Sequence, residues 1–283
     1  MSYLYDKQGE GDADLLALEQ RLGEAGYRPK LRARRWPVLV AAGLAVAATL
    51  AFFVAPRGTA LPVTTASGGQ SSLAVGRWLE PDEAATIAVA DIGRVTVEPS
   101  SRVRIVETHA QRHRLELVRG ALHAKVVAPP RLFVVDTPSA QAVDLGCEYD
   151  LSVEADGATK LVVTHGEVSL EGGGVSSRVS VGAQARSKKG QPPGVPRSVK
   201  AGAQVTAALD AFEQGGELAQ VLEVAEAGDA VSLWNLLARV NGGAQREAVL
   251  DRLLALTGAR GIDRAKVLAL DAPALETLWK TFP

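Results

Sequence analysis

RVTVEPSSRVRIV, residues 94–106, alternates apolar with polar side chains on both sides of a turn at Pro99. Residues 86–90 and 114–118 show the same alternation. Because successive side chains of a β-strand point to opposite faces, a period of two is typical of strands with one buried face. Glycine, proline and aspartate separate these runs at short intervals, as turns between strands require. The sequence therefore predicts an all-β domain of short antiparallel strands over residues 57–190, arranged as a sandwich, roll or solenoid.

Six short motifs follow one another along this domain. They are Val75-Gly76-Arg77-Trp78-Leu79, Ile92-Gly93-Arg94-Val95-Thr96-Val97, Leu117-Val118-Arg119-Gly120-Ala121-Leu122, Phe133-Val134-Val135-Asp136-Thr137-Pro138, Val143-Asp144-Leu145-Gly146-Cys147 and Val162-Val163-Thr164-His165-Gly166-Glu167-Val168. Their order and spacing resemble the FecR domain, over about residues 73–187. The resemblance implies a single-pass membrane sensor or anti-sigma-type regulator, which receives a protein or envelope cue in the periplasm. Cys147 stands where that family usually has threonine.

An uncharged apolar run extends from Trp36 to Ala55, and three arginines within residues 32–35 precede it. About 19 helical residues cover roughly 28 Å, close to the ~30 Å hydrocarbon core of a bilayer. We therefore expect one transmembrane helix over residues 36–56. The arginines place the N-terminus in the cytoplasm and the later residues in the periplasm, at the bacterial inner membrane that the resemblance implies. A cleavable signal peptide and a buried helix of a soluble protein are the alternatives.

The tail that precedes this run, residues 1–35, is too short to form a hydrophobic core. Leu15, Leu18 and Leu22 recur at helical spacing in it, which indicates an amphipathic helix. We expect these three leucines to contact a cytoplasmic protein or the membrane surface. A partly ordered tail with an incidental leucine stripe is the alternative.

Small residues recur at every fourth position of the apolar run, at Gly43, Ala47 and Ala51. A stripe of this kind lets two membrane helices approach each other closely. The pattern predicts a homodimer through these three residues. The alternative is that the stripe only reflects an abundance of alanine.

Composition argues against nucleic-acid binding, and no motif indicates catalysis. The formal net charge is −1, so there is no basic surplus to bind phosphates. Cys147 is the only cysteine, which leaves no partner for an internal disulfide.

His109 and His113 have the spacing of metal ligands on a helix, but they lie in a predicted hairpin loop, where solvated histidines are expected. Asp136 and Asp144 are interpreted as turn and edge residues, and we predict no catalytic residue, metal site or cofactor.

The chain returns to helical spacing after residues 191–202, a segment rich in proline and glycine that is interpreted as a linker. Residues 203–283 are expected to form five or six short helices, with Asp229 and Asp271 at N-cap positions and Pro273 in the first turn of the last helix. We expect antiparallel helix pairs stacked as in a short α-repeat array. A packed bundle without a binding surface is the alternative.

Together these segments predict a mixed, multi-domain chain with one transmembrane helix, an all-β domain and an all-α C-terminal array. The leading hypothesis is a non-enzymatic membrane regulator that binds a protein or envelope cue in the periplasm and passes it to a cytoplasmic partner of the sigma-factor type. The alternative is an envelope scaffold that binds other exported proteins or cell-wall material without signalling.

Overall fold

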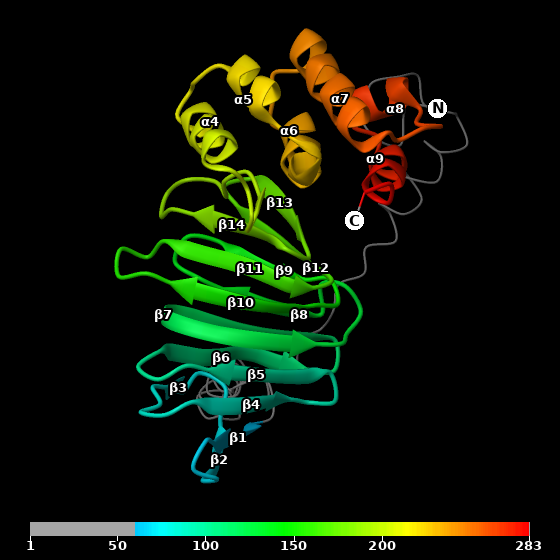
Figure 1. Ribbon diagram of the computed structural model, residues 1–283. Coiled ribbons are helices and arrows are strands. Elements are labelled where there is room, and N and C mark those ends of the chain that lie inside the picture. The colour runs from blue at the N-terminus through cyan, green and yellow to red at the C-terminus, as the bar shows by residue number, and fades with distance from the viewer. Residues whose placement is uncertain (1–59, 283) are drawn as a thin grey trace, which may run out of the picture. The chain divides into compact units, whose positions relative to one another are not determined.

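The computed structural model describes residues 60–282, in which strands come first and helices follow (Figure 1). The strands are β1 (Leu61–Thr65), β2 (Gln70–Leu73), β3 (Trp78–Leu79), β4 (Ala85–Val89), β5 (Gly93–Val97), β6 (Arg102–His109), β7 (Arg112–Val126), β8 (Phe133–Asp136), β9 (Gln141–Asp144), β10 (Glu148–Val153), β11 (Thr159–His165), β12 (Glu167–Gly172), β13 (Val175–Ser180), β14 (Ala183–Ser187) and β15 (Arg197–Ser198). Paired strands are antiparallel except for β7 and β8, which are parallel. The prediction of short antiparallel strands is therefore confirmed for this part of the chain.

Strand β7 is 15 residues long and belongs to two sheets. Its first half pairs with β6 and β8 in sheet A, which has the order β3-β6-β7-β8-β9-β12-β13. Its second half pairs with β5 and β10 in sheet B, which has the order β2-β1-β4-β5-β7-β10-β11-β14-β15. Gly120 stands at the crossing with a φ of 86°, and a Cβ atom there would clash with Ser101. Glycine is therefore required where β7 passes from one sheet to the other.

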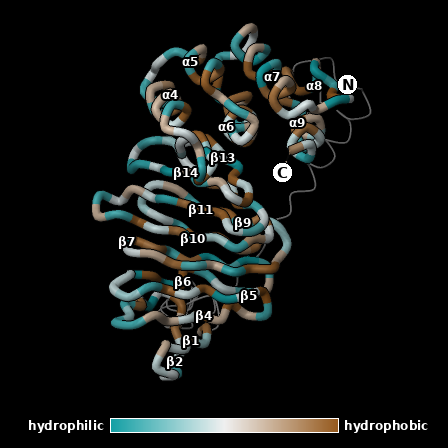
Figure 2. The backbone as a smooth tube through the Cα atoms, in the orientation of Figure 1, coloured by the Kyte–Doolittle hydropathy of each residue, from teal (hydrophilic) through white to brown (hydrophobic). Residues whose placement is uncertain are grey.

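Apolar side chains from both sheets form one hydrophobic core. Val103 and Ile105 of sheet A and Val95 and Val97 of sheet B are completely buried in it. Figure 2 shows hydrophobic and hydrophilic residues alternating along these strands, as the sequence predicts. Burying a side chain of this size contributes roughly 1.5–3 kcal/mol, so the alternation itself fixes which face of each strand points inward.

The C-terminal part of the chain is helical, and its apolar faces form a second core. Its helices are α4 (Ala203–Glu213), α5 (Leu218–Val224), α6 (Ala230–Leu237), α7 (Gly243–Thr257), α8 (Arg264–Leu268) and α9 (Ala272–Trp279), with a 3₁₀ turn at Ala227–Asp229. The expected number of short helices is confirmed. Val231 of α6 and Trp279 of α9 belong to the core of the sheets instead, so they connect the two parts.

The two expected N-caps have different outcomes. Asp271 caps α9, because its Oδ1 accepts a hydrogen bond from the Ala274 N–H at 3.0 Å. Asp229 occupies the N-cap position of α6, as expected, but its carboxylate makes no cap hydrogen bond to that helix. Its Oδ2 instead accepts the Glu226 N–H at 2.9 Å and closes the 3₁₀ turn that precedes this helix.

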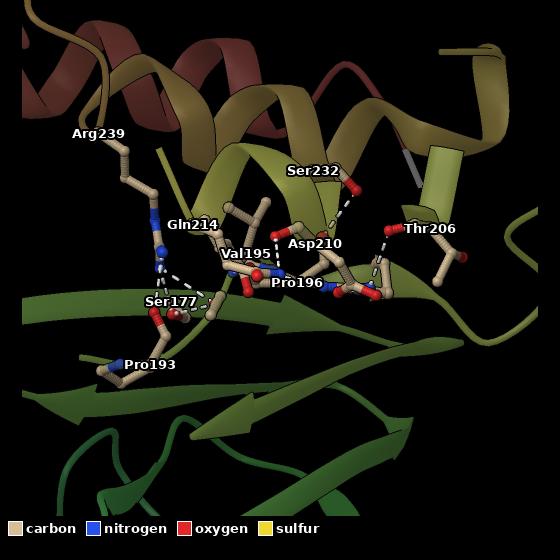
Figure 3. Close-up of polar contacts among 12 residues, drawn as sticks. Ser177, Pro193, Val195, Pro196, Thr206, Asp210, Gln214, Ser232 and Arg239 are labelled. Atoms are coloured by element: carbon tan, nitrogen blue, oxygen red, sulfur yellow. Dashed lines mark hydrogen bonds and ion pairs between the residues drawn. The ribbon is translucent and has the colours of Figure 1, made fainter. Parts of the chain in front are cut away.

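Residues 191–202 lie between the sheets and the helices and are held by both (Figure 3). Arg239 donates to the carbonyl oxygen of Pro193 at 2.8 Å, and Ser232 donates to that of Pro196 at 2.7 Å. Val195 is buried in the helical core, and its N–H donates to Glu213 at 2.5 Å. Polar side chains of the helices thus satisfy backbone groups that proline-rich segments leave without partners.

The expected fold class needs correction, because it included a transmembrane helix over residues 36–56. Among the described residues no helix is long and apolar enough to cross a membrane. The longest of these helices, α7, has 15 residues and would span about 22 Å, less than the ~30 Å of a bilayer core. The described chain is mainly antiparallel sheet with a C-terminal helical part, and the apolar run at Trp36–Ala55 lies outside it.

Candidate functional site

The residues singled out for partner binding and helix packing are not in the part of the chain that the structure describes. They are Leu15, Leu18, Leu22, Gly43, Ala47 and Ala51. The partner contact of the leucines and the dimer contact of the small residues therefore stay predictions.

The two histidines with metal-like spacing lie in the hairpin of β6 and β7, as expected. His109 ends β6 and His113 is the second residue of β7, so Ala110 and Gln111 form the turn between them. The expectation that both are solvated is wrong for His113, which is 4% exposed and has its Nδ1 atom 2.7 Å from Thr108 Oγ1. Burial lowers the pKa of this imidazole, so His113 is a neutral core residue. No group of three metal-ligating side chains occurs within residues 60–282.

A row of polar and charged side chains covers the outer surface of sheet A, opposite the core. We call it the charged face, and it consists of Trp78, Arg104, Arg114, Glu116, Asp136, Gln141, Ser169 and Glu171. These residues occupy the polar positions of the strand alternation, so burial of their apolar neighbours fixes their direction. The sequence pattern therefore places side chains from β3, β6, β7, β8, β9 and β12 on one surface.

Ion pairs join neighbouring strands across the charged face. Arg114 of β7 has its Nε atom 2.5 Å from an Asp136 carboxylate oxygen on β8, and the other oxygen accepts from Gln141 on β9 at 2.8 Å. Arg104 of β6 likewise lies 2.5 Å from Glu116 of β7. The hydrogen bond to Asp136 raises the pKa of the Arg114 guanidinium, which therefore stays charged at neutral pH.

A bidentate ion pair lies at the β12 end of the charged face. Arg131 donates from Nη1 and Nη2 to the two carboxylate oxygens of Glu171, at 2.9 and 3.1 Å. These hydrogen bonds, together with one from Ser169, hold the pKa of Glu171 below its usual range. Because a planar guanidinium matches a carboxylate in this geometry, the pair fixes the position of Glu171 on β12.

Trp78 forms the other end of the row, on the short strand β3. The guanidinium carbons of Arg102 and Arg104 lie 4.4 and 4.6 Å from its ring centroid. Stacking of this kind is favourable because the ring face carries partial negative charge. A partly exposed tryptophan held between two arginines is typical of the aromatic anchors that protein interfaces use.

A shallow pocket of about 480 Å³ opens in the middle of the charged face. Its lining consists of Arg114, Glu116, Asp136, Thr137, Ala140, Gln141, Glu171 and Gly172. Charged and amide groups of this lining can exchange hydrogen bonds with a polar segment of a partner. The lining contains neither a histidine nor a cysteine, so it lacks the usual general base and thiol nucleophile.

Sequence reasoning interpreted Asp136 as an edge residue and did not identify this site. The polar positions of the strands were readable, but their assembly depends on β8 joining β7 in parallel. That pairing brings residues 114 and 136 together. No pattern in the sequence between them indicates that the two strands are neighbours. β8 ends at Asp136, directly before Thr137 and Pro138, which agrees with the restricted backbone of a residue before proline.

Asp144 does stand at a turn, where β9 ends, but the sequence did not indicate that it is buried. Asp144 is completely buried at the end of β9, where its carboxylate accepts the Gly146 N–H at 3.0 Å and the Cys147 thiol. Burial raises the pKa of Asp144 and also that of Cys147. The thiol therefore stays protonated and acts as a donor, in the place where the FecR motif usually has a threonine hydroxyl.

Comparison with known proteins gives a family match and similar solved structures. Residues 78–169 match the family model described as FecR protein. Two crystal structures of a proposed anti-sigma factor from Parabacteroides distasonis ATCC 8503 are similar, each at 18% identity with a TM-score of 0.38. Each alignment covers 47% of this chain and 64% of the other, so this chain spans less than two thirds of that protein. No curated protein matches the sequence.

The family match includes β3 to β11 and the first residues of β12, so it contains most of the charged face. It ends before β13 and the helices, which lie outside the match. The resemblance indicated by the six motifs is confirmed, and the chain carries a FecR-type domain over residues 78–169.

Proposed function

We propose that this chain is a regulatory protein of the FecR type whose β domain binds another protein through the charged face. The observation that carries the proposal is that the segment matching the FecR family builds this face. Trp78, Arg104, Arg114, Asp136 and Gln141 all lie within residues 78–169 and converge on one side of sheet A.

The chemistry of the face suits a protein partner with complementary charges. The side chains of Arg114 and Asp136 are 31% and 16% exposed, so both reach solvent while held in place. Partly exposed ion pairs contribute little to stability, typically up to about 1 kcal/mol, and can be exchanged for pairs with a partner at small cost. Ordered charges of both signs give binding its orientation and specificity.

The direction of the signal is part of the same proposal. A cue bound at the β domain would be passed to a cytoplasmic partner of the sigma-factor type, which contacts Leu15, Leu18 and Leu22. The periplasmic location of the β domain belongs to this proposal and is supported by the match to the FecR family. Deletion of residues 1–30 should abolish signalling while leaving binding at the charged face intact. Unchanged signalling after this deletion would favour the envelope scaffold instead.

Charge reversal at the face tests the binding site directly. The tagged chain, its Arg114→Glu variant and its Arg264→Glu variant are each captured from cross-linked cells, and the co-purified proteins are quantified. Arg264 is the matched control, because it pairs with Asp251 at 2.5 Å on the surface of the helices, outside the family match. We expect a protein captured by the wild-type chain and by Arg264→Glu to be lost with Arg114→Glu. Equal capture by all three chains would contradict the proposal, provided that circular dichroism shows all three to be folded.

A further inference from the structure

The two edges of sheet A differ in how they are protected from pairing with another strand. At one edge, β3 has two residues and lies beside Arg102 and Arg104, and short strands with charges are poor templates for pairing. At the other edge, β13 has six residues, VSSRVS, with no proline and one charge. That charge, on Arg178, is paired within the sheet with Glu167 of β12 at 2.6 Å. The sequence of β13 therefore carries no strong protection of its own.

Helix α6 covers the open edge of β13 and makes the hydrogen bonds that a neighbouring strand would make. The Arg178 N–H donates to Oδ1 of Asn235 at 2.9 Å, and Nδ2 of Asn235 donates back to the Arg178 carbonyl oxygen at 2.9 Å. A side-chain amide thus makes the two hydrogen bonds that a paired strand would make with this residue. Asn235 is 3% exposed, and its Nδ2 also donates to Val231 within α6.

Helix α9 holds the side chain of the same residue. The Arg178 guanidinium carbon lies 4.3 Å from the ring centroid of Trp279, and its Nη1 atom lies 2.5 Å from Glu276. The indole N–H of Trp279 donates to Glu167 at 2.6 Å. Helix α6 therefore contacts the backbone of Arg178, and helix α9 contacts its side chain.

The contact between the helices and the sheets has a large polar component beside the apolar contacts of Val231, Trp234, Trp279 and Phe282. The sheets and the helices have separate hydrophobic cores, and Val231 and Trp279 are the buried helical residues that belong to the core of the sheets. Beside the amide and ion pairs at Arg178, Arg239 donates to Ser177 of β13 at 2.5 Å (Figure 3). Polar interfaces of this kind between parts of one chain resemble those of transient complexes and permit the parts to separate.

We propose that the C-terminal helices are a removable cap on β13, and that the uncapped edge pairs with β13 of a second copy of this chain. The second copy is the occupant because it offers an edge of the same length with its Arg178 charge already balanced by Glu167 in its own sheet. Two such edges can join antiparallel across a twofold axis, as isologous interfaces require. The cap thereby keeps the chain monomeric at this edge, and its release is a switch to dimerisation.

The test weakens the cap without removing any helix. In the double variant Asn235→Leu and Glu276→Lys, the amide that pairs with the Arg178 backbone is lost and the ion pair becomes a repulsion. Asn241→Ala and Glu223→Lys form the control, since both residues are exposed on the helical part and lie away from β13. Light scattering measures the mass of each full chain, hydrogen exchange follows the Arg178 amide, and circular dichroism reports whether the helices persist.

We expect the double variant to form a dimer as its concentration rises and, while dilute and monomeric, to exchange the Arg178 amide roughly tenfold or more faster than the wild type. Adding Ser176→Lys to the double variant should restore the monomer, because a lysine on an edge strand opposes pairing. A double variant that stays monomeric while its Arg178 amide exchanges faster overturns the proposal. Unchanged exchange of that amide also overturns it, because the cap then does not depend on Asn235 and Glu276. A dimer in the control, or one that Ser176→Lys leaves intact, also overturns it.

Discussion

Arg114 and Asp136 are paired at 2.5 Å across β7 and β8, the two neighbouring strands of sheet A that run in parallel. A parallel pair needs a crossover connection. Here the second half of β7 runs along sheet B, and the chain then returns to sheet A through residues 127–132. The ion pair therefore joins residues that are 22 positions apart in the sequence. It also places a fixed positive and a fixed negative charge in the middle of the charged face.

The Arg114 and Asp136 pair should matter more for binding than for folding. We predict that Arg114→Ala lowers the free energy of unfolding by no more than about 1 kcal/mol, because both partners contact solvent. Urea denaturation of the single variants and of the double variant with Asp136→Ala isolates the pair energy. A loss of several kcal/mol would show that the pair holds the sheets together.

The hydrogen bond from Cys147 to Asp144 predicts opposite effects for two substitutions of similar size. Cys147→Thr retains a donor and supplies a stronger one, so we expect stability equal to or greater than that of the wild type. Cys147→Val removes the donor and leaves a buried oxygen of Asp144 without that partner, which should cost about 1–3 kcal/mol. Urea denaturation of both variants measures the difference, and equal stabilities would contradict the assigned hydrogen bond.

Asp144 should make stability depend on pH. Burial raises its folded-state pKa above the unfolded value, so folding favours the protonated carboxyl. The resulting stabilisation is fully present below the unfolded pKa and is lost as pH rises through the folded pKa. We therefore predict that the stability of Asp144→Asn relative to the wild type increases with pH over this window. Unfolding free energies measured from acidic to neutral pH test this, and a constant difference would count against a raised pKa.

Gly120 should tolerate alanine less well than another glycine with a positive φ. Gly120 and Gly174 have φ angles of 86° and 76°, so alanine is strained at both, by roughly 1–2 kcal/mol. A Cβ atom at Gly120 also clashes with Ser101, whereas one at Gly174 meets no atom within 4 Å. Thermal unfolding should therefore show a clearly larger loss for Gly120→Ala than for Gly174→Ala. Equal losses would mean that the crossing of β7 does not depend on this close approach.

The strand alternation allowed the β domain to be predicted well, because burial of one face is a local property of each strand. The turn at Pro99 and the cap at Asp271 were also predictable, because turn and cap preferences are local as well. The division of β7 between two sheets was not predictable, since alternation does not say which strand pairs with which half. The same limit applies to the charged face, whose members come from six strands.

Two polar residues show a second limit of the sequence. His113 was expected to be solvated and Asp144 to lie in a turn or at an edge, yet both side chains are buried. Each has a hydrogen-bonding partner within five residues, Thr108 and Cys147 respectively. Such partners make burial of a polar group tolerable, but they act only once the backbone has brought them together.

The central claim is that the charged face binds a protein. It is tested most directly by a photo-crosslinking amino acid placed at Gln141, on the pocket lining, and at Gln245, an exposed residue of α7, as the control. After irradiation of cells that contain each chain, we predict a discrete cross-linked protein from position 141 and none of that mass from position 245. The same products from both positions, or no product from position 141, would contradict the account.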